Sequence, residues 1–412
     1  MRKTVFWGIL PLFWIDFVCT ATGCEKIQQQ LNRHRPIVLT KTEQAITNQA
    51  GDFALRMFQQ VAAEEKEAFF ISPFSASLAL SMAANGTAGE TADQMKEVLG
   101  FGDFSYEDMN GYFAKLSDKL PKADKSTTLA IANSLWTRKG FPVYKEYKQL
   151  LKDYYMAQAE ELDFNSPLAI RVINNWCSRN TNGLIDIILD EIDAAMVAYL
   201  INALYFKGTW VHKFDKEHSF EGVYYPDYSP EKNVMYMEQI NTFPYTDTQW
   251  ASIASFPYGN ESFSMIVLLP KEGVSVHQVI ENHLNPDAWH AMINKLENRK
   301  EKLNVVMPRF KSEYEKDLIP TLQAMGMTLP FMAGVANFSN LSPAAGLYIG
   351  LVKQKTFVEV HEEGAEAAAV TVVGIKEAAY HPDDPIPFIM NKSFVYAIVE
   401  KSTGTLLFMG KQ

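Results

Sequence analysis

A run of very small side chains, residues 364–371, stands between two stretches that have the residue pattern of strands. Before the run, Phe357 to His361 alternates valines with charged groups, which is typical of a half-buried strand. After it, a long polar loop leads to a second apolar stretch at residues 388–390. Any fold for this chain must therefore carry a long loop, hinged at Gly364, between two strands.

The small-residue run itself has two interpretations. Alanine and glutamate are strong helix formers, so local propensity predicts a short helix over residues 365–370. The same residues include no proline, no bulky side chain and little charge, so they could instead enter between two existing strands and satisfy their backbone hydrogen bonds there. A loop that is helix-prone when intact and becomes a strand after cleavage would store free energy.

The composition indicates one large body without nucleic-acid partners. The chain has 412 residues, of which 47% are hydrophobic, and no linker divides residues 42–412, which we expect to form a single domain. The 38 basic and 48 acidic side chains give a net charge of 38 − 48 = −10, spread along the chain without long runs of one sign. This pattern argues against nucleic acid or an anionic membrane surface as a partner.

The first residues have the form of an export signal. Basic residues at positions 2 and 3 precede an apolar run at residues 5–18, interrupted by Asp16 and too short to span a membrane. Ala21-Thr22-Gly23-Cys24 then resembles a bacterial lipobox, in which the cysteine is lipidated; an ordinary signal-peptidase site near Ala21 or Gly23 is the alternative. We therefore expect a signal peptide at residues 1–23, a polar tether at residues 24–41, and an exported protein, either a cell-envelope lipoprotein or a secreted one.

Cysteine use agrees with this division of the chain. Cys19 lies in the predicted signal and Cys24 at the predicted cleavage site, which leaves Cys177 without a disulfide partner in the mature body. With no histidine nearby, Cys177 is predicted to be a packed, inert thiol. The body must then be stabilised by its core.

Patterns along the body predict an α+β fold with large sheets. Phe69 to Ile71 is a short apolar strand, followed by the helix-starting pair Ser72 and Pro73. Residues 196–206 form a nearly unbroken apolar run, which predicts a central strand buried on both faces. Asn202 lies inside that run and needs a hydrogen-bond partner. Helical patterns dominate the first half and strand patterns the second.

Motifs for catalysis and cofactor binding are missing from the sequence. It contains no Gly-x-Ser-x-Gly, His-Glu-x-x-His, Cys-x-x-Cys, P-loop or dinucleotide fingerprint. The nearest approach to a metal motif, at residues 361–363, has no second histidine at helical spacing. The sequence therefore predicts neither an enzyme nor a bound cofactor or metal.

Several blocks, in order along residues 42–412, resemble the serpin family. They are Phe70-Ile71-Ser72-Pro73-Phe74-Ser75, which is similar to the start of the family's second helix; residues 202–210, similar to its central strand; Asn391-Lys392-Ser393-Phe394, with serine where the family has proline; and Leu407-Phe408-Met409-Gly410, similar to its closing strand. The resemblance implies a serpin-like α+β fold with large mixed or antiparallel sheets, a cluster of helices and an exposed reactive-centre loop at about residues 362–387.

The resemblance also implies a mechanism, the trapping of a protease. The loop serves as bait, the enzyme forms its acyl intermediate, and the cleaved loop inserts into the main sheet before the intermediate is hydrolysed. Insertion needs a hinge of small residues. The residues at the hinge positions are Glu362, Gly364, Ala365, Glu366, Ala367, Ala368, Ala369 and Val370, where Ala365 replaces the commoner threonine.

Family spacing from Glu362 places the cleaved bond between Ala378 and Ala379, which suits elastase-like serine proteases. The loop after this bond is longer than is common, so Lys376, Glu377 and Tyr380 remain alternatives. The implied partner is a serine protease in a covalent acyl complex, with cysteine proteases as a second class, and membranes are contacted through the lipid anchor alone; a monomer is expected. The alternative is a non-inhibitory binding or chaperone-like protein whose loop is cleaved as a substrate without trapping the protease.

Four polar residues match the positions at which the family's sheet parts to admit the loop. They are Ser72, Ser75, Asn202 and Gln354. Gln354 stands where the family usually has histidine, and an amide can replace the hydrogen bonds of the ring but cannot titrate. The resemblance therefore predicts a sheet-opening network without pH sensitivity at this position.

Overall fold

The computed structural model of the protein describes residues 34–364 and 384–412. Helices dominate the first half of the chain, as expected from the sequence. The helices are α2 (Lys41–Glu64), α3 (Pro73–Ala84), α4 (Gly89–Val98), α5 (Tyr106–Lys119), α6 (Lys145–Tyr155), α7 (Pro167–Asn180), α8 (Val276–His283), α9 (Pro286–Asn298) and α10 (Ile319–Ala324), with short 3-10 helices η1 (Leu120–Lys122), η2 (Lys216–His218) and η3 (Leu329–Phe331).

Strands dominate the second half of the chain. Over all described residues, the strands are β1 (Phe69–Ile71), β2 (Thr128–Arg138), β3 (Gln158–Leu162), β4 (Ala198–Lys207), β5 (Phe220–Tyr224), β6 (Lys232–Asp247), β7 (Ala251–Tyr258), β8 (Phe263–Pro270), β9 (Lys300–Pro308), β10 (Phe310–Asp317), β11 (Lys353–Val360), β12 (Ile386–Ile389), β13 (Val395–Glu400) and β14 (Thr405–Lys411). The predicted α+β class is confirmed.

Local side-chain chemistry sets where the first helices begin. The Thr40 hydroxyl accepts a hydrogen bond from the Glu43 backbone N–H, and the Glu43 carboxylate accepts one from Thr40, which together form a capping box for α2. The Ser72 hydroxyl accepts a hydrogen bond from the Ser75 backbone N–H at the start of α3, and Pro73 occupies the first helical position. The predicted helix start at Ser72 and Pro73 is therefore confirmed.

Within the described residues, most strands join one nine-stranded sheet. Its order is β1-β14-β13-β8-β7-β6-β9-β12, with β5 paired to β6. Strands β8, β13 and β14 are buried along their whole length. Such continuous burial explains why their sequences are apolar runs rather than alternating patterns.

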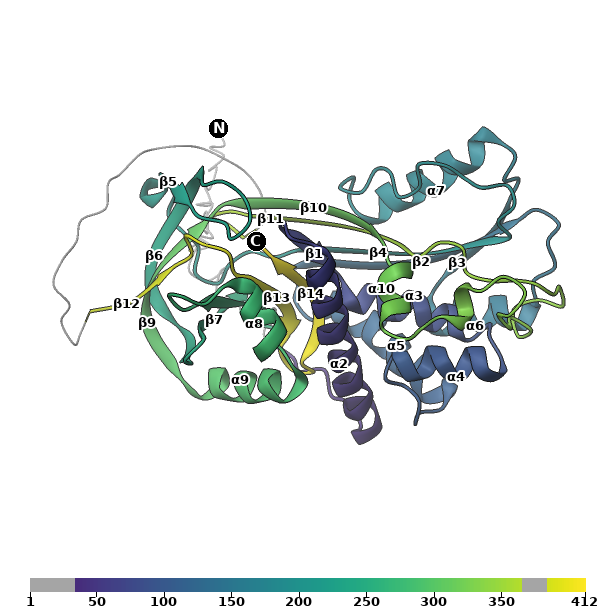
Figure 1. The fold of residues 1–412 in the computed structure, drawn as a ribbon, viewed down its shortest axis with the longest axis horizontal. Helices are drawn as coiled ribbons and strands as arrows, with labels where there is room; N and C mark the ends of the chain where they lie inside the picture. The colour runs from purple at the N-terminus through teal and green to yellow at the C-terminus, as the bar shows by residue number, and fades with distance from the viewer. Residues whose placement is uncertain (1–33, 365–383) are drawn as a thin grey trace, which may run out of the picture. The chain divides into compact units, whose positions relative to one another are not determined.

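Five further strands lie in a second layer, which is divided. The described residues form a three-stranded sheet of order β3-β2-β4 and a separate two-stranded sheet of β10 and β11. Strands β4 and β11 run next to each other in this layer (Figure 1). We call the line between β4 and β11 the seam.

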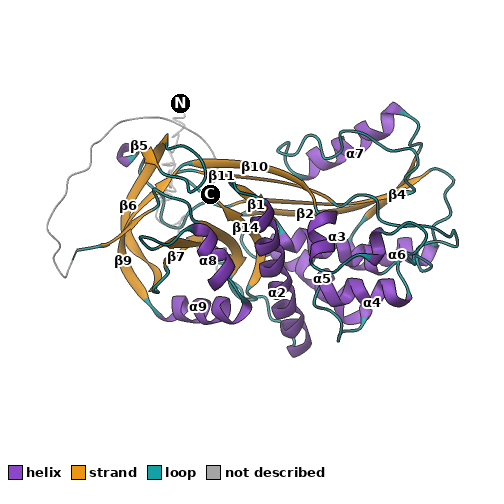
Figure 2. Ribbon diagram, in the orientation of Figure 1, coloured by secondary structure: helices purple, strands orange, loops and turns teal. Residues whose placement is uncertain are grey.

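Helices cover both faces of the five-strand layer (Figure 2). Helix α7 packs on one face, where Trp176 and Ile173 meet Trp136 of β2 and Tyr199 of β4 in a separate apolar cluster. The other face carries α3, which contacts β4 and belongs to the main core. Any change in the spacing of the seam must therefore involve both helical layers.

The prediction of a central strand at residues 196–206 needs a correction. A strand is present, β4, and both of its faces pack against apolar clusters. However, β4 is hydrogen-bonded to β2 on one side, whereas its other edge borders the seam, and Asn202 is half-buried. An apolar run indicates burial of the side chains, but it does not reveal whether both backbone edges are paired.

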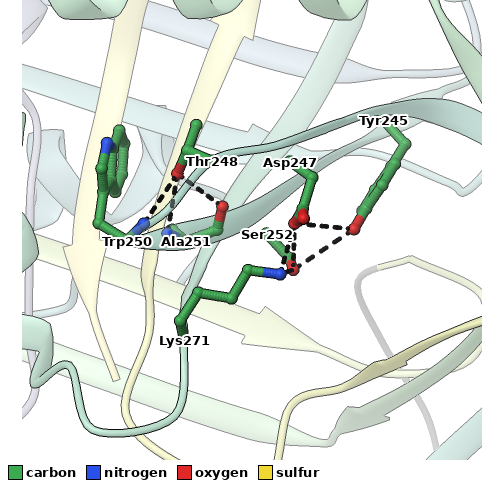
Figure 3. A network of polar contacts seen from close by, with 7 residues as sticks. All are labelled: Tyr245, Asp247, Thr248, Trp250, Ala251, Ser252 and Lys271. Carbon is green, nitrogen blue, oxygen red and sulfur yellow. Dashed lines mark hydrogen bonds and ion pairs between the residues drawn. The ribbon is translucent and has the colours of Figure 1, made fainter.

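A polar network fixes the hairpin between β6 and β7 (Figure 3). Lys271 Nζ lies 2.5 Å from the Asp247 carboxylate, and the hydroxyls of Tyr245 and Ser252 donate hydrogen bonds to the same carboxylate at 3.1 and 2.9 Å. Trp250, at the turn, stacks on the His283 ring of α8 with centroids 4.8 Å apart. Local contacts thus fix the turn of this hairpin.

The described chain before α2 lies against the turn between β13 and β14. The backbone N–H of Ile37 donates a hydrogen bond to Ser402 Oγ at 2.8 Å, and the Ile37 side chain is buried. His34 Nδ1 lies 3.1 Å from Ser262 Oγ. Among the helices that the structure describes, none has the length and apolar character needed to cross a membrane.

Candidate functional site

The seam is the candidate site, because it is where two neighbouring strands leave backbone groups unpaired by a ladder. In residues 34–364 and 384–412, ladder hydrogen bonds pair β4 with β2 and β11 with β10, and no ladder joins β4 to β11. Strand edges that no ladder joins to each other can accept another strand between them. Contacts hold the seam at three levels. We call the end near Gly364, which follows β11, the upper level, the contacts of Gln354 the middle level, and the contacts of Lys353, the first residue of β11, the lower level.

At the upper level, the chain turns back immediately after β11. His361 and Gly364 exchange backbone hydrogen bonds of 3.0 and 3.1 Å, which closes a four-residue turn. The turn is tied to the chain after β4, since the Trp210 backbone N–H donates to the Glu363 carbonyl at 2.9 Å and the Trp210 ring N–H donates to the His361 carbonyl at 2.9 Å. The predicted hinge thus begins in a turn that closes the upper seam.

Gly364 fits this turn because it has no Cβ. Its φ is +126°, and a Cβ placed there would lie 2.0 Å from the Gly208 carbonyl oxygen. Residues with side chains rarely adopt this conformation. The sequence prediction of a glycine hinge therefore has a structural reason in the closed turn.

Glu362 anchors the turn through a buried ion pair. Its side chain is fully buried, and its Oε1 accepts hydrogen bonds from Arg309 Nε at 2.7 Å and from Ser219 Oγ at 2.5 Å. Burial raises the pKa of the Glu362 carboxyl, but the hydrogen bonds from Ser219 and Arg309 outweigh burial and leave the pKa below its ordinary value. The first hinge residue is therefore held as a carboxylate.

His361 is buried in the same turn and does not form a metal site with its neighbours. Its Nδ1 accepts a hydrogen bond from the Glu363 backbone N–H at 3.2 Å, and burial lowers the pKa of its ring. Throughout the described parts of the chain, no three His, Cys, Asp or Glu side chains gather as a metal centre would require.

At the middle level, the start of α3 connects both edges of the seam. Gln354 of β11 forms two hydrogen bonds with the Ser72 backbone: its Oε1 accepts from the N–H at 2.9 Å, and its Nε2 donates to the carbonyl at 2.8 Å. On the β4 side, the Ser75 hydroxyl donates to Asn202 Oδ1, and Asn202 Nδ2 donates to Asn133 Oδ1 at 2.7 Å. The structure brings together all four residues of the predicted sheet-opening network.

Below this level, the seam opens into a small cavity. Its volume is about 130 Å³, and its floor includes Ala76, Ala79 and Ala83 of α3. The first half of β4 and the chain that leads into β11, residues 347–354, form its sides. Small side chains beneath the seam leave room where a strand with small side chains would lie.

Other predicted site residues fall outside the described residues. These are the hinge residues Ala365, Glu366, Ala367, Ala368, Ala369 and Val370, the candidate cleavage-site residues Lys376, Glu377, Ala378, Ala379 and Tyr380, and the candidate lipidation site Cys24. Their roles stay predictions. Cys177 is a buried free thiol whose pKa burial raises to about 12, in line with an inert packed cysteine.

Sequence reasoning missed the residues that hold the hinge from outside. Arg309 and Ser219 contact the turn at residues 361–364, and neither was singled out from the sequence. Trp210 was recognised as the last residue of a family block, but its contact with the turn was not predicted. Arg309 lies between β9 and β10, 53 positions from Glu362. A lone arginine after a proline at a strand end gives no signal that it has a buried acidic partner.

Comparison with known proteins supplies the context for this site. The family model described as Serpin (serine protease inhibitor) matches residues 48–412. Human Serpin B3 is 33% identical over 383 residues, covering 87% of this chain and 96% of its own length, and an uncharacterized serpin-like protein of Thermococcus kodakarensis is 32% identical over 375 residues, covering 90% and 85%.

A solved structure is similar over nearly the whole chain. The thermophilic serpin tengpin in its native state is 33% identical, with a TM-score of 0.80 over 93% of this chain and 97% of that one. The same serpin in its latent state gives a TM-score of 0.76 over 91% and 98%. The overall fold is therefore shared with a solved relative.

Proposed function

The chain belongs to the serpin family, and on this premise we propose that it is a suicide-substrate inhibitor of serine proteases. Members of the family are usually protease inhibitors, act on target proteases, and are generally not catalytic enzymes. The observation that carries the proposal is the seam, where β4 and β11 adjoin without a ladder beside the hinge at Gly364.

The covalent step uses the chemistry of the target. The serine Oγ of the protease attacks the carbonyl carbon of Ala378, and the bond from that carbon to the nitrogen of Ala379 breaks. A proton from the protease passes to the new amino group, and an ester joins Ala378 to the protease. Hydrolysis of this ester would release the enzyme, so trapping requires that the cleaved loop insert first.

Insertion is supported by the geometry of the seam. A strand that entered between β4 and β11 would pair with the backbone groups of both edges, which the described chain leaves without a common ladder. The turn at residues 361–364 would straighten into a continuation of β11. The small side chains at residues 365–370 would enter between the two strands at little steric cost.

The preferred targets follow from the residues at the cleaved bond. Alanine at positions 378 and 379 favours elastase-like enzymes with small specificity pockets, whereas Lys376 would attract trypsin-like enzymes and Tyr380 chymotrypsin-like ones. We propose the elastase-like class first. Cysteine proteases would form a thioester at the same carbonyl and are the second class.

The test is to mix the purified body with elastase, trypsin and chymotrypsin separately, followed by denaturing gels and mass spectrometry. We expect an adduct that survives denaturation, together with a released fragment that begins at Ala379. Ala367→Pro should give cleavage without adduct, because proline cannot pair within a sheet, whereas Ala367→Ser, a matched small side chain, should still trap. Clean cleavage of the unaltered protein by all three enzymes would favour the non-inhibitory alternative.

Export and anchoring are a separate proposal. Residues 1–23 would direct export, and lipidation of Cys24 would hold the body at the cell envelope. Cys24→Ser should shift the protein from the membrane fraction to the soluble fraction. Unchanged fractionation would leave secretion through ordinary signal cleavage as the better account.

A further inference from the structure

The connection between α7 and β4, residues 181–197, crosses the lower end of the seam. Its residues Ile188 and Leu189 are buried and line the cavity beneath the seam. Asn174 of α7 holds this connection, since its Oδ1 accepts hydrogen bonds from the backbone N–H groups of both residues at 3.0 Å and its Nδ2 donates to the Leu189 carbonyl at 2.8 Å. The connection is thus fixed to α7.

A second tie joins the same connection to the opposite edge of the seam. Lys353, the first residue of β11, places its Nζ 2.5 Å from Asp190 Oδ2 and 2.6 Å from Glu315 Oε1 of β10. Lys355 Nζ lies 3.4 Å from the other oxygen of Glu315. These charges form a row from the α7 side, across the first residues of β11, to β10.

Lys353 is an unusual residue for its surroundings. Its side chain is 15% exposed and lines the cavity next to Val352 and Leu351, where an apolar residue would be expected. Burial lowers the pKa of Lys353, but hydrogen bonds to Asp190 and Glu315 outweigh burial, so its pKa lies above the ordinary value and the group stays charged. A mostly buried lysine with two acidic partners gives directed contacts that an apolar side chain could not give.

We propose that the ion pair between Asp190 and Lys353 is a latch on the lower seam, which slows the entry of a strand between β4 and β11. The inference rests on the proposed function, because it concerns the insertion step of that mechanism. A strand that passes below Gln354 must move the α7–β4 connection away from β11. The Asn174 contacts move together with α7, whereas the contact between Asp190 and Lys353 crosses the seam and must break.

The latch acts on the rate of insertion as a positioning contact, without touching the protease. Asp190 is 68% exposed, so the pair is partly solvated, and an exposed ion pair contributes little by itself. Lys353 is less exposed and shared between two carboxylates, which strengthens the row as a network. We expect loss of the latch to speed insertion about three- to ten-fold, in line with the usual energies of such networks.

The experiment measures insertion without a protease. A synthetic peptide with the sequence of residues 364–377 is incubated with the full chain, and its incorporation is followed over time on native gels and by the rise in unfolding temperature. Lys353→Met and Asp190→Asn should each incorporate the peptide faster than the unaltered protein. Lys355→Met is the matched control, because Lys355 forms an ion pair with Glu315 and not with Asp190, and it should speed incorporation much less than Lys353→Met does.

A charge exchange makes the test specific. The double variant Asp190→Lys with Lys353→Asp restores an ion pair with reversed charges, although the new carboxylate on β11 then lies beside Glu315, so partial recovery of the slow rate is expected. Rates that stay unchanged in both Lys353→Met and Asp190→Asn while the peptide still enters would overturn the latch and leave the proposed inhibition intact. Failure of the peptide to enter any variant would contradict strand insertion itself, and the latch with it.

Discussion

The nine-stranded sheet and the five-strand layer hold their strands in different ways. Strand β13 is paired with β14 on one side and with β8 on the other, and all its residues are buried. Strand β4 has a ladder to β2 on one side, while its other edge borders a cavity and is connected to β11 through neighbouring segments. One part of the molecule is closed by continuous backbone ladders, and the other by a few isolated contacts.

This difference shows which part can change. Removing a strand from the middle of the nine-stranded sheet would break two ladders and expose apolar residues. The free-energy cost of this change is far larger than that of losing any single contact. Separating β4 from β11 requires the loss of a small set of polar contacts: the turn at Gly364, the hydrogen bonds of Gln354, and the pair of Asp190 with Lys353. We therefore expect the layer to open at the seam without unfolding.

The largest expected effect comes from the buried ion pair at the upper seam. Arg309→Met leaves the Glu362 carboxylate buried without its charged partner, which should lower the free energy of unfolding of the closed form by about 3–5 kcal/mol. Chemical denaturation with circular dichroism measures this change. Arg299→Met, which removes an exposed pair with Glu301, is the control and should cost less than about 1 kcal/mol.

The same pair gives the seam a pH dependence with a definite sign. Because folding lowers the pKa of Glu362, its charge stabilises the folded state above the ordinary carboxyl pKa of 4.5, and this stability is lost as the pH falls through the lower folded-state pKa. The stability difference between the unaltered protein and Glu362→Gln should thus shrink below pH 4.5. A difference that stayed constant through this range would show that the ion pair does not act on stability.

The next largest effect is expected at the hinge glycine. Gly364→Ala puts a Cβ against the Gly208 carbonyl at a φ of +126°, which should destabilise the closed turn by about 2–4 kcal/mol. An extended strand accepts alanine readily, so this variant should also take up the 364–377 peptide faster. Gly404→Ala, at a φ of +78° with open space around it, is the matched control and should cost about 1 kcal/mol.

A smaller effect is expected in the middle of the seam. Gln354→Ala leaves both the N–H and the carbonyl of Ser72 without their side-chain partners in a buried place, which should cost about 1–3 kcal/mol. Thermal unfolding reports the loss. Gln354→His should recover part of the stability and make it depend on pH between about 5 and 8, where histidine titrates; a pH-independent variant would contradict the assigned contacts.

The smallest effect is expected in the nine-stranded sheet. Lys271→Met removes the ion pair with Asp247 at the β6–β7 hairpin (Figure 3), but the Tyr245 and Ser252 hydroxyls still donate to that carboxylate. The loss should be below about 1 kcal/mol. The rate of peptide incorporation should not change, and an increase equal to that of Lys353→Met would remove the distinction between the two parts of the molecule.

Much of the fold followed from local patterns. The cap at Ser72, the apolar strands at both ends of the body and the helix-to-strand order were predicted and are confirmed. The family was also identified correctly, because its motifs are continuous stretches of sequence. Each of these features depends on residues close together in the chain, so a single sequence is enough to reveal it.

The rest depends on contacts between distant residues. The pairing of Glu362 with Arg309 and of Asp190 with Lys353 joins positions 53 and 163 apart, and no local pattern marks the partners. The seam was hidden for a related reason: the side chains of β4 are those of a fully enclosed strand, whereas the missing ladder involves backbone groups, which every residue carries.

The most direct test of the central claim is hydrogen exchange before and after the loop is cleaved. The protein is cut by elastase within residues 365–383, and amide exchange along β4 and β11 is followed by mass spectrometry. If the seam receives the cleaved loop, amides of both strands should exchange far more slowly after cleavage, while β13 stays unchanged. Equal exchange of β4 and β11 before and after cleavage would contradict the claim that the seam is where the loop inserts.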